Sequence, residues 1–184
     1  MKIVAGKYRT RQLHTLEGLA TRPTITRTRE AIFNSMGQFF RNGETVLDVF
    51  GGSGALSFES ISRGAKKAII LDSSLEAISI IKKNAMMLRC MDQVEIIRGE
   101  YKDVLPTLVG KYRFDIIFLD PPFRMKVIDE LVEYILKNDL LASQGMIMAE
   151  YPKEDIVQKQ YSELRVHKCA MYASSEVTIF KKHT

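Results

Sequence analysis

Apolar residues in this chain recur in two alternating patterns. Short apolar runs with the character of buried strands begin at residue 45 and are TVLDVF, KAIILD, VEIIRG, FDIIFLD and GMIMAE. The segments between these runs carry apolar residues at helical spacing. Such alternation indicates a mostly parallel sheet with helices on both faces. Two more strand-like runs, LRVHK and EVTIF, follow Glu150, and with them we expect a seven-stranded, doubly wound α/β fold of the Rossmann-like type.

The N-terminal stretch KIVAGKYRTRQL alternates between apolar and polar residues around a glycine. This pattern predicts a β-hairpin with Ile3 and Val4 on one arm and residues 9–13 on the other. No linker, internal repeat or low-complexity tract follows in the sequence. We therefore expect one domain over residues 1–184, with residues 1–21 as a basic N-terminal hairpin extension.

A helix is predicted after the hairpin and a polar loop. In TRTREAIFNSMGQFF the apolar residues fall at helical spacing, and Thr26 can serve as the N-cap. Asn42 and Gly43 follow the apolar stripe, and such a pair is typical of a helix end. We expect the helix to run from Thr26 to this pair.

Composition supports a globular protein and argues against several other classes. The 184 residues are 46% hydrophobic and 27% charged, which suits one domain with a substantial core. No run approaches the roughly 18 apolar residues of a membrane span, and the N-terminus lacks the apolar centre of a signal peptide. Cys90 and Cys169 stand apart from each other and from the three histidines. We expect a cytoplasmic monomer with no disulfide, metal or membrane partner.

The net charge of +5 is concentrated at the N-terminus. Residues 1–30 contain seven basic and two acidic side chains, whereas the remaining 20 basic and 20 acidic residues cancel. A cationic arm on a neutral body suggests a polyanionic partner, because Lys and Arg contacts to phosphate supply much of nucleic-acid affinity. A solvated hairpin face explains the charge alone equally well.

Acidic residues occur where the predicted strands end. Asp48 lies at the end of the first sheet strand, Asp72 after the second, Glu100 shortly after the third and Asp120 after the fourth. Each of them alone could be a helix N-cap or a solvated loop residue. Together they meet at the edge where an open parallel sheet binds ligands, and they would repel one another without a ligand. The pattern predicts a binding site.

The stretch LDVFGGSGALSFES places three glycines between a strand and a helix, so backbone can approach a ligand closely. A dinucleotide fingerprint needs glycine where this chain has Ser57, and no P-loop ending is present. A ligand held by close backbone and acids remains, and S-adenosylmethionine is the candidate. In this interpretation Asp72 accepts both ribose hydroxyls, and Glu100 faces the adenine amino group.

The fourth strand continues into FLDPPFRMK. Asp120 and the carbonyl of Pro121 form two acceptors suited to an exocyclic NH2 group, and Pro121 with Pro122 stiffens the loop. The acceptors disperse the positive charge that develops on the nitrogen during methyl transfer. Phe123 would stack on a base that has been taken out of its stack. A tight turn explains the DPP segment alone, whereas the following Phe and the glycine turn favour methyl transfer.

Four motifs in order resemble the RsmD-type bacterial methyltransferases, which methylate a guanine N2 in small-subunit ribosomal RNA. The motifs are IVAGKYRTRQL, RPTITRTREAIFNSM, LDVFGGSGALSFESISRGA and FLDPPF. The resemblance spans nearly the whole chain. It implies a class I methyltransferase fold, S-adenosylmethionine as cofactor with S-adenosylhomocysteine as product, and the 16S rRNA or the 30S ribosomal particle as partner.

The resemblance also implies a role for particular residues. The catalytic set that binds the target base is Asp120, Pro121, Pro122 and Phe123. The cofactor set is Asp48, Phe50, Gly51, Gly52, Ser53, Gly54, Asp72, Ser73, Glu100 and Tyr101. The RNA-contact set is Lys7, Arg9, Arg11, Arg22, Thr24, Arg27 and Arg29. Asp72 and Glu100 depart from the family's usual Glu and Asp, which puts cofactor affinity in doubt more than cofactor identity.

Two alternatives remain open at the level of sequence. An acceptor pair and a stacking ring can serve adenine N6 as well as guanine N2, so methylation of adenine in DNA or RNA is one of them. A chain of this length has no spare segment for a separate recognition domain of the kind that sequence-specific DNA enzymes use. The other alternative is an RNA-binding module that keeps a methyltransferase fold without its activity. The intact DPPF and glycine turn argue against it.

Overall fold

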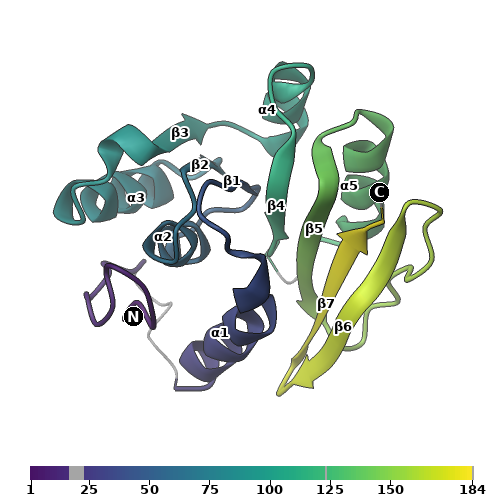
Figure 1. Ribbon diagram of the computed structural model, residues 1–184, viewed down its shortest axis with the longest axis horizontal. Helices are drawn as coiled ribbons and strands as arrows, with labels where there is room; N and C mark the ends of the chain where they lie inside the picture. Colours follow the sequence, from purple (N-terminus) through teal and green to yellow (C-terminus); the bar gives the residue numbers. More distant parts are fainter. Residues whose placement is uncertain (17–22, 123, 184) are drawn as a thin grey trace.

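The computed structural model describes residues 1–16, 23–122 and 124–183, and its centre is one sheet of seven strands (Figure 1). The strands are β1 Thr45–Asp48, β2 Lys67–Asp72, β3 Val94–Arg98, β4 Phe114–Leu119, β5 Leu141–Pro152, β6 Leu164–Tyr172 and β7 Ser175–Lys182. Their order across the sheet is β3-β2-β1-β4-β5-β7-β6. Strands β1 to β5 run parallel, and β7 is antiparallel to both of its neighbours. The predicted seven-stranded, mostly parallel sheet is confirmed.

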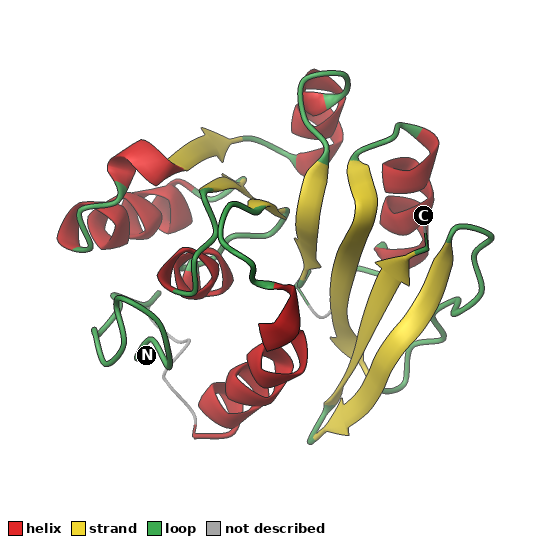
Figure 2. Ribbon diagram, in the orientation of Figure 1, coloured by secondary structure: helices red, strands yellow, loops and turns green. Residues whose placement is uncertain are grey.

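Helices cover both faces of this sheet (Figure 2). The helices are α1 Pro23–Met36, η1 Gly37–Phe39, α2 Ala55–Ser62, α3 Leu75–Met87, η2 Met91–Gln93, α4 Tyr101–Leu108 and α5 Ile128–Lys137. Helices α1, α2 and α3 pack on one face, and α4 and α5 pack on the other. Because both faces are covered, the central residues of β2 read as a continuous apolar run and are fully buried.

Helix α1 differs from the predicted helix at both ends. It begins at Pro23, so Thr26 lies inside the helix and is not its N-cap. Proline suits the first helical position, because the N–H group that it lacks has no partner within the helix there. The α-helix ends at Met36, where a glycine opens the 3-10 turn η1. Asn42 and Gly43 have φ of 70° and 120° and form a separate turn before β1.

The N-terminal hairpin consists of two short arms joined by one bridge. Lys2 pairs with Gln12 in an antiparallel bridge, and the Ile3 N–H donates to the Arg11 carbonyl at 3.0 Å. The side chains of Ile3 and Leu13 are buried in the core that α1, α2 and α3 form with the sheet. The hairpin is therefore packed against the body, beside α2 and α3 (Figure 1).

Two polar side chains of α2 hold the hairpin backbone. The carboxylate of Glu59, which is 1% exposed, accepts the N–H groups of Val4 at 3.0 Å and Ala5 at 3.2 Å. The hydroxyl of Ser62 accepts the Tyr8 N–H at 2.9 Å and donates to the Ala5 carbonyl at 2.6 Å. A buried carboxylate is stable only with such donors, so the arm and α2 stabilise each other.

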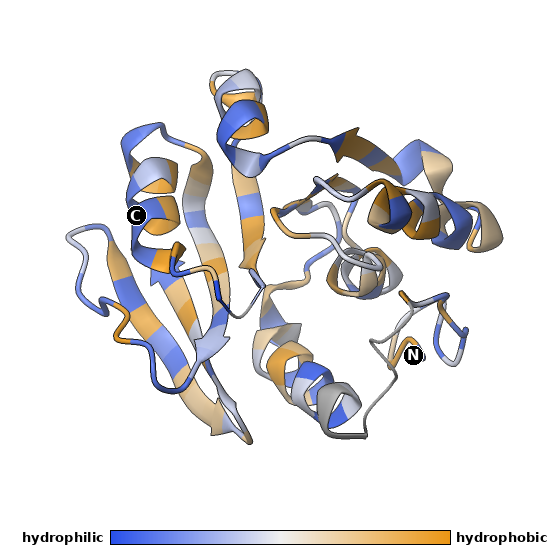
Figure 3. Cartoon of the chain, turned by 180° about the vertical axis from the view of Figure 1, so that it is seen from behind, coloured by the Kyte–Doolittle hydropathy of each residue, from blue (hydrophilic) through white to orange (hydrophobic). Residues whose placement is uncertain are grey.

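Hydropathy follows this architecture. The strands alternate or run apolar where helices cover them, and the helices turn polar faces outward (Figure 3). Within the described ranges, no helix is long and apolar enough to cross a membrane.

Candidate active site

Four acidic side chains lie at the carboxyl ends of the adjacent strands β2, β1, β4 and β5. Asp72 and Asp48 are the last residues of β2 and β1, Asp120 directly follows β4, and Glu150 lies near the end of β5. Each acid stands two positions after a strand residue that packs toward α1, α2 and α3. Since side chains alternate along a strand, all four acids point to that face. This edge is where open parallel sheets bind ligands.

Asp48 is fully buried at the end of β1. The hydroxyl of Ser57 in α2 donates to its Oδ2 at 2.8 Å, whereas its Oδ1 is buried without a partner. Burial raises the pKa of Asp48 to about 7; the charge of Asp72 also raises it, and the Ser57 bond opposes the rise. A buried polar atom without a donor costs free energy. The geometry therefore fits a ligand that brings a hydrogen-bond donor to Oδ1.

The turn between β1 and α2 brings its backbone close to this carboxylate. A Cβ atom on Gly51 would come within 2.5 Å of the Ile70 side chain, so a larger residue there would force Ile70 to shift. Gly54 has a φ of 81°, in the left-handed region that favours glycine, and its N–H donates to the Gly51 carbonyl at 2.8 Å. Helix α2 begins at the next residue, so its free N–H groups lie at the same edge.

Two side chains fix the position of this turn. Asp72 accepts the Gly52 N–H at Oδ2 and the Ser74 N–H at Oδ1, both at 2.9 Å. Each of its oxygens keeps a second lone pair for a further donor. Asn84 in α3 is fully buried and donates to the Ser53 carbonyl at 2.9 Å. Cofactor contacts predicted for this turn therefore rest on a backbone that neighbouring elements hold in place.

The remaining residues of the predicted cofactor set lie around the ends of β1, β2 and β3. The rings of Phe50 and Tyr101 meet edge to face, with their centroids 5.4 Å apart. Tyr101 begins α4 and is nearly buried, and burial raises its pKa. Glu100 is at the N-cap position without a side-chain capping bond and is exposed, as is Ser73. The pair of rings offers an apolar surface next to two exposed polar side chains.

These residues fit S-adenosylmethionine in chemical type. The free Oδ1 of Asp48 can accept an ammonium donor, and Asp72 retains acceptor capacity for hydroxyl groups. The glycine turn lets backbone reach the ligand, and the rings of Phe50 and Tyr101 suit a flat heterocycle. Among the residues that the structure describes, no three His, Cys, Asp or Glu side chains gather in a way that could hold a metal ion.

Asp120 is the central carboxylate of the edge, between Asp48 on β1 and Glu150 on β5. It is half-buried. Burial raises its pKa well above the ordinary value, and the charges of Glu150 and Asp48 raise it further. No salt bridge reaches any of these three carboxylates from the described part of the chain. The arrangement suits a substrate group that brings hydrogen-bond donors.

Two prolines follow Asp120. Pro121 is buried and Pro122 is exposed. The Pro122 carbonyl accepts the Met125 N–H at 2.9 Å, which closes a turn. Phe123, to which the sequence gives a stacking role, lies outside the described residues.

Basic residues of the predicted RNA-contact set differ in exposure. Four of them present exposed side chains: Lys7, Arg9, Arg11 and Arg27. The Lys7 ammonium donates to Gln93 Oε1 at 3.0 Å, and the Arg11 guanidinium donates to the Met87 carbonyl at 3.1 Å, so the arm spans the α3 and η2 region. Arg22 and the side chain of Thr24 lie outside the described part of the chain.

The assignment of Arg29 to the RNA-contact set is wrong. Arg29 is 5% exposed, and its guanidinium donates to the Lys2 carbonyl of the hairpin. Burial lowers its pKa, which the nearby Glu59 opposes. Residue 29 is four positions before Phe33 and seven before Met36, so all three share the inward face of α1. Arg29 joins α1 to the hairpin and does not face solvent.

Three site residues escaped the sequence analysis: Ser57, Asn84 and Glu150. Ser57 lies in the first turn of α2, after the glycine-rich segment, where serine is common. Asn84 interrupts the apolar stripe of α3, and a polar residue within such a stripe is a usable signal. In the sequence, Glu150 is the last residue of the apolar run GMIMAE, and β5 continues past it to Pro152.

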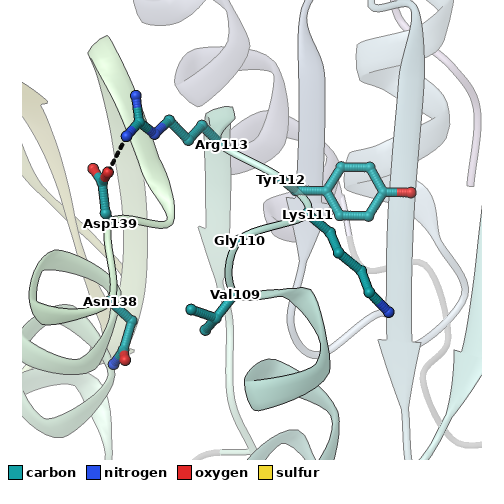
Figure 4. Close-up of a pocket in the computed structure, with 7 residues that line it drawn as sticks. All are labelled: Val109, Gly110, Lys111, Tyr112, Arg113, Asn138 and Asp139. Atoms are coloured by element: carbon teal, nitrogen blue, oxygen red, sulfur yellow. Dashed lines mark hydrogen bonds and ion pairs between the residues drawn. The ribbon is translucent and has the colours of Figure 1, made fainter.

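A separate hollow lies at the opposite edge of the sheet (Figure 4). The loops that precede β4 and β5 line it with Val109, Gly110, Lys111, Tyr112, Arg113, Asn138 and Asp139. Arg113 and Asp139 form an ion pair across it. This hollow is at the amino ends of the parallel strands, far from the four acids, and its lining offers no group that the chemistry described above requires.

Comparison with known proteins shows the family to which the chain belongs. The family model described as Conserved hypothetical protein 95 matches residues 1–181. Ribosomal RNA small subunit methyltransferase D of Haemophilus influenzae is 34% identical over 155 residues, which are 84% of this chain and 80% of that protein. The chain belongs to this family, the RsmD family.

Solved structures agree with membership of the RsmD family. A chain from Streptococcus pyogenes is 33% identical, with a TM-score of 0.79, and the match covers 84% of this chain and 95% of that one. The yhhF protein of Escherichia coli is 25% identical, with a TM-score of 0.84, and the match covers 100% of this chain and 98% of that one. The Rossmann-like methyltransferase fold predicted from the sequence is confirmed.

Proposed function

We propose that this RsmD-family chain transfers a methyl group from S-adenosylmethionine to the exocyclic N2 of a guanine in small-subunit ribosomal RNA. The observation that carries the proposal is the row of carboxylates at one sheet edge. In that row the buried, half-satisfied Asp48 lies beside Asp120, the acid of the DPPF motif. The name of the Haemophilus influenzae relative supports ribosomal RNA as the substrate. The exposed basic arm supports an RNA partner, in assembled or assembling 30S particles.

Asp48, the glycine turn and Asp72 would hold the cofactor. S-adenosylmethionine supplies an electrophilic methyl group when it is bound there. Asp48 Oδ1 takes the ammonium group, and the oxygens of Asp72 take ribose hydroxyls. The N–H bonds from Gly52 and Ser74 keep the Asp72 carboxylate in position for those hydroxyls. These contacts would hold the cofactor at the carboxyl ends of β1 and β2, and β4, which leads to Asp120, is the next strand of the sheet.

Asp120 would act on the amino group of the base. Its carboxylate and the Pro121 carbonyl accept the two hydrogens of the NH2 group, which turns the nitrogen lone pair out of the ring plane. The new nitrogen–carbon bond would replace the carbon–sulfur bond of the sulfonium, and S-adenosylhomocysteine would leave as a neutral thioether. Positive charge would then develop on the nitrogen, and the Asp120 carboxylate would stabilise that charge. One proton then leaves the nitrogen through the acceptor that holds it. No stronger base is needed, because the charged nitrogen is acidic.

The test is nucleoside mass spectrometry of small-subunit RNA. Undermodified particles from cells that lack the enzyme are incubated with the purified chain and methyl-labelled cofactor. We expect labelled N2-methylguanosine at one position. Labelled N6-methyladenosine would keep the chemistry and overturn the choice of base. The absence of label in particles and in naked RNA, from a chain that binds S-adenosylhomocysteine, would contradict the proposed activity.

A further inference from the structure

Glu150 occupies a position beside the proposed reaction centre. Strand β5 pairs in parallel with β4, and Leu119 is opposite Ala149, so Asp120 and Glu150 are the next neighbours along that edge. Adjacent strands lie about 4.8 Å apart, and both side chains point to the face that α1, α2 and α3 cover. On the other side of β4, Asp48 of β1 is in register with Phe118, two residues before Asp120. Across strands β1, β4 and β5, the order of the acids is therefore Asp48, Asp120 and Glu150, starting from the proposed cofactor site.

The carboxylate of Glu150 is held from one side only. The hydroxyl of Ser175, which is buried at the start of β7, donates to Glu150 Oε1 at 2.9 Å. In the described residues no further hydrogen bond and no basic side chain reaches Glu150. Glu150 is half-buried, and burial raises its pKa. Two neighbouring carboxylates with so few donors are costly unless a ligand supplies N–H groups.

An independent observation at Asp48 indicates that this edge of the sheet binds a ligand with hydrogen-bond donors. Asp48 is 0% exposed, and its Oδ1 has no hydrogen-bond partner among the residues that the structure describes. The missing donors at Asp48 belong to the cofactor in the proposed function. Asp120 and Glu150 are half-buried and continue the row away from the cofactor turn, so their carboxylates are open to donors from the base.

The donor pattern of guanine matches two acceptors side by side. On its Watson–Crick edge the N2 amino group is adjacent to N1–H, so guanine presents donors to both Asp120 and Glu150. Adenine has its N6 amino group next to N1, which is an acceptor. A carboxylate at that place repels adenine and leaves its own charge without a donor. Sites built around such a bond reject analogues that lack the partner hydrogen.

We propose that Glu150 accepts the N1–H of the target guanine and thereby selects guanine over adenine. The proposal rests on the proposed function and adds to it a residue that specifies the base. Asp120 holds the reacting amino group, Glu150 fixes the ring beside it, and Ser175 keeps the Glu150 carboxylate aimed at the ring.

The variant Glu150→Gln tests this proposal. In the variant, the amide oxygen keeps the hydrogen bond from Ser175. The amide NH2 then takes the position of the other carboxylate oxygen, where its hydrogens would meet the N1–H of guanine. With undermodified small-subunit particles we expect kcat/KM to fall on the order of 10- to 100-fold, the range of one good base-edge contact. The melting temperature should not fall, because the variant removes the repulsion between Asp120 and Glu150, and S-adenosylhomocysteine affinity should stay unchanged. The matched control is Glu154→Gln, at an exposed position beyond β5, which should behave like the wild type.

A second readout separates base recognition from a structural role. Guanosine monophosphate and its 2-aminopurine analogue are compared as inhibitors of particle methylation; the analogue keeps the 2-amino group and has an acceptor at N1. The wild type should prefer guanosine monophosphate, and Glu150→Gln should lose or reverse this preference. The same preference in both proteins, or none in the wild type, overturns the proposal.

The outcomes of this test and of the proposed function are distinguishable. If the wild type makes no N2-methylguanosine, the proposed function fails before any variant is compared. If the wild type makes it and Glu150→Gln is within twofold of that rate, only the role of Glu150 is overturned. The role of Glu150 is also overturned if the variant loses S-adenosylhomocysteine affinity by the same factor as the rate. A lowered melting temperature of the variant overturns it as well.

Discussion

Asp48 is a buried carboxylate with one hydroxyl donor and one free oxygen. Burial raises its pKa from the ordinary 3.8 to about 7 in the folded chain. The folded state thus holds this proton more tightly than the unfolded chain does, so the contribution of Asp48 to stability falls as pH rises from about 4 to about 7. A residue that costs stability at neutral pH is typical of a binding function.

Replacing Asp48 with Asn should raise stability and remove cofactor binding. The amide keeps the shape of the side chain and the Ser57 partner but carries no charge. At pH 8 the free energy of unfolding should therefore rise by about a few kcal/mol. The gain should shrink toward pH 4, where Asp48 is neutral in the folded wild type as well. Urea unfolding at both pH values measures it. Equal stability of the two proteins at pH 8 would contradict the burial cost.

Cofactor affinity should depend on pH through the same carboxylate. An ammonium group needs Asp48 charged, so binding releases a proton whenever the free chain holds one. Below pH 7 the affinity for S-adenosylhomocysteine should fall roughly tenfold per pH unit, and above it the affinity should level off. Calorimetry in buffers of different ionisation enthalpy measures both the affinity and the proton released. A flat profile between pH 5 and pH 8 would argue against the ammonium contact.

Asp120→Ala should abolish turnover while cofactor binding stays largely intact, since the Asp120 side chain acts on the base. We expect kcat to fall by at least roughly 100-fold, as for other groups that stabilise developing charge. Single-turnover methylation of particles measures the rate, and titration with S-adenosylhomocysteine controls for folding. Asp115→Ala is a matched control, because Asp115 accepts a backbone bond from Thr45 at the far end of the same sheet. An unchanged rate for Asp120→Ala would show the assigned mechanism to be wrong.

At the scale of elements, one side chain of α3 joins the hairpin segment to the glycine turn. Asn84 Oδ1 accepts the His14 N–H at 2.7 Å, and its Nδ2 donates to the His14 carbonyl at 3.0 Å. The same Nδ2 donates to the Ser53 carbonyl at 2.9 Å. The Asn84 amide therefore bonds to two segments at once. One is the segment that follows the basic arm, and the other is the turn proposed to hold the cofactor.

Asn84→Ala should loosen both elements at once. Three hydrogen bonds of a fully buried side chain are lost, so we expect a destabilisation of about 2 to 4 kcal/mol. Hydrogen exchange should accelerate at residue 14 and in the turn near residue 53 together. Asn138→Ala is the control, because Asn138 bonds only to the Tyr134 carbonyl at the end of α5. Faster exchange at one of the two segments alone would contradict the coupling.

At the scale of the whole molecule, positive and negative charge lie in neighbouring regions. The carboxylates occupy one edge of the sheet, and the arm with Lys7, Arg9 and Arg11 is packed against α2 and α3 beside it. An RNA that contacts the arm through phosphates can extend one base toward the acidic edge. Acids alone would repel that RNA, so the arm has to supply the attraction.

The double variant Arg9→Glu with Arg11→Glu should weaken RNA binding and lower its salt dependence. If both side chains contact phosphate, the slope of log affinity against log salt should drop by roughly 1.4 to 1.8. Filter binding of small-subunit RNA over a salt series measures the slope. The control exchanges Lys111 and Lys137 for Glu, two exposed residues at the opposite edge. Equal slopes for both double variants would indicate that the arm does not bind RNA.

Much of the fold was predictable because its signals are local. Strands buried on both faces produce apolar runs, and parallel strands bring their ends to one edge, so Asp48, Asp72 and Asp120 could be grouped from the sequence. Glu150 has the same position on its strand, but β5 continues to Pro152, so the sequence gives no break after it. Its proximity to Asp120 depends on strand register, which apolar runs do not encode.

Residues that bond over long sequence distances were the least predictable. Charge placed Arg29 among the RNA contacts, although its spacing from Phe33 puts it on the buried face of α1. Glu59 and Asn84 are polar residues in apolar stripes, which signals a buried partner without telling which. Their partners are backbone groups of the hairpin segment, and a backbone group has no sequence signature.

The attachment of the hairpin has a consequence for the order of events during synthesis. The backbone of residues 4–8 is bonded to side chains more than fifty positions later, and His14 to one seventy positions later. The arm is therefore made before the helices that hold it, and it can be placed only after they have been made. Until α2 and α3 exist, its charges have no fixed arrangement. A surface that depends on this arm is completed only with the body, so ordered presentation of its basic residues marks a fully folded molecule.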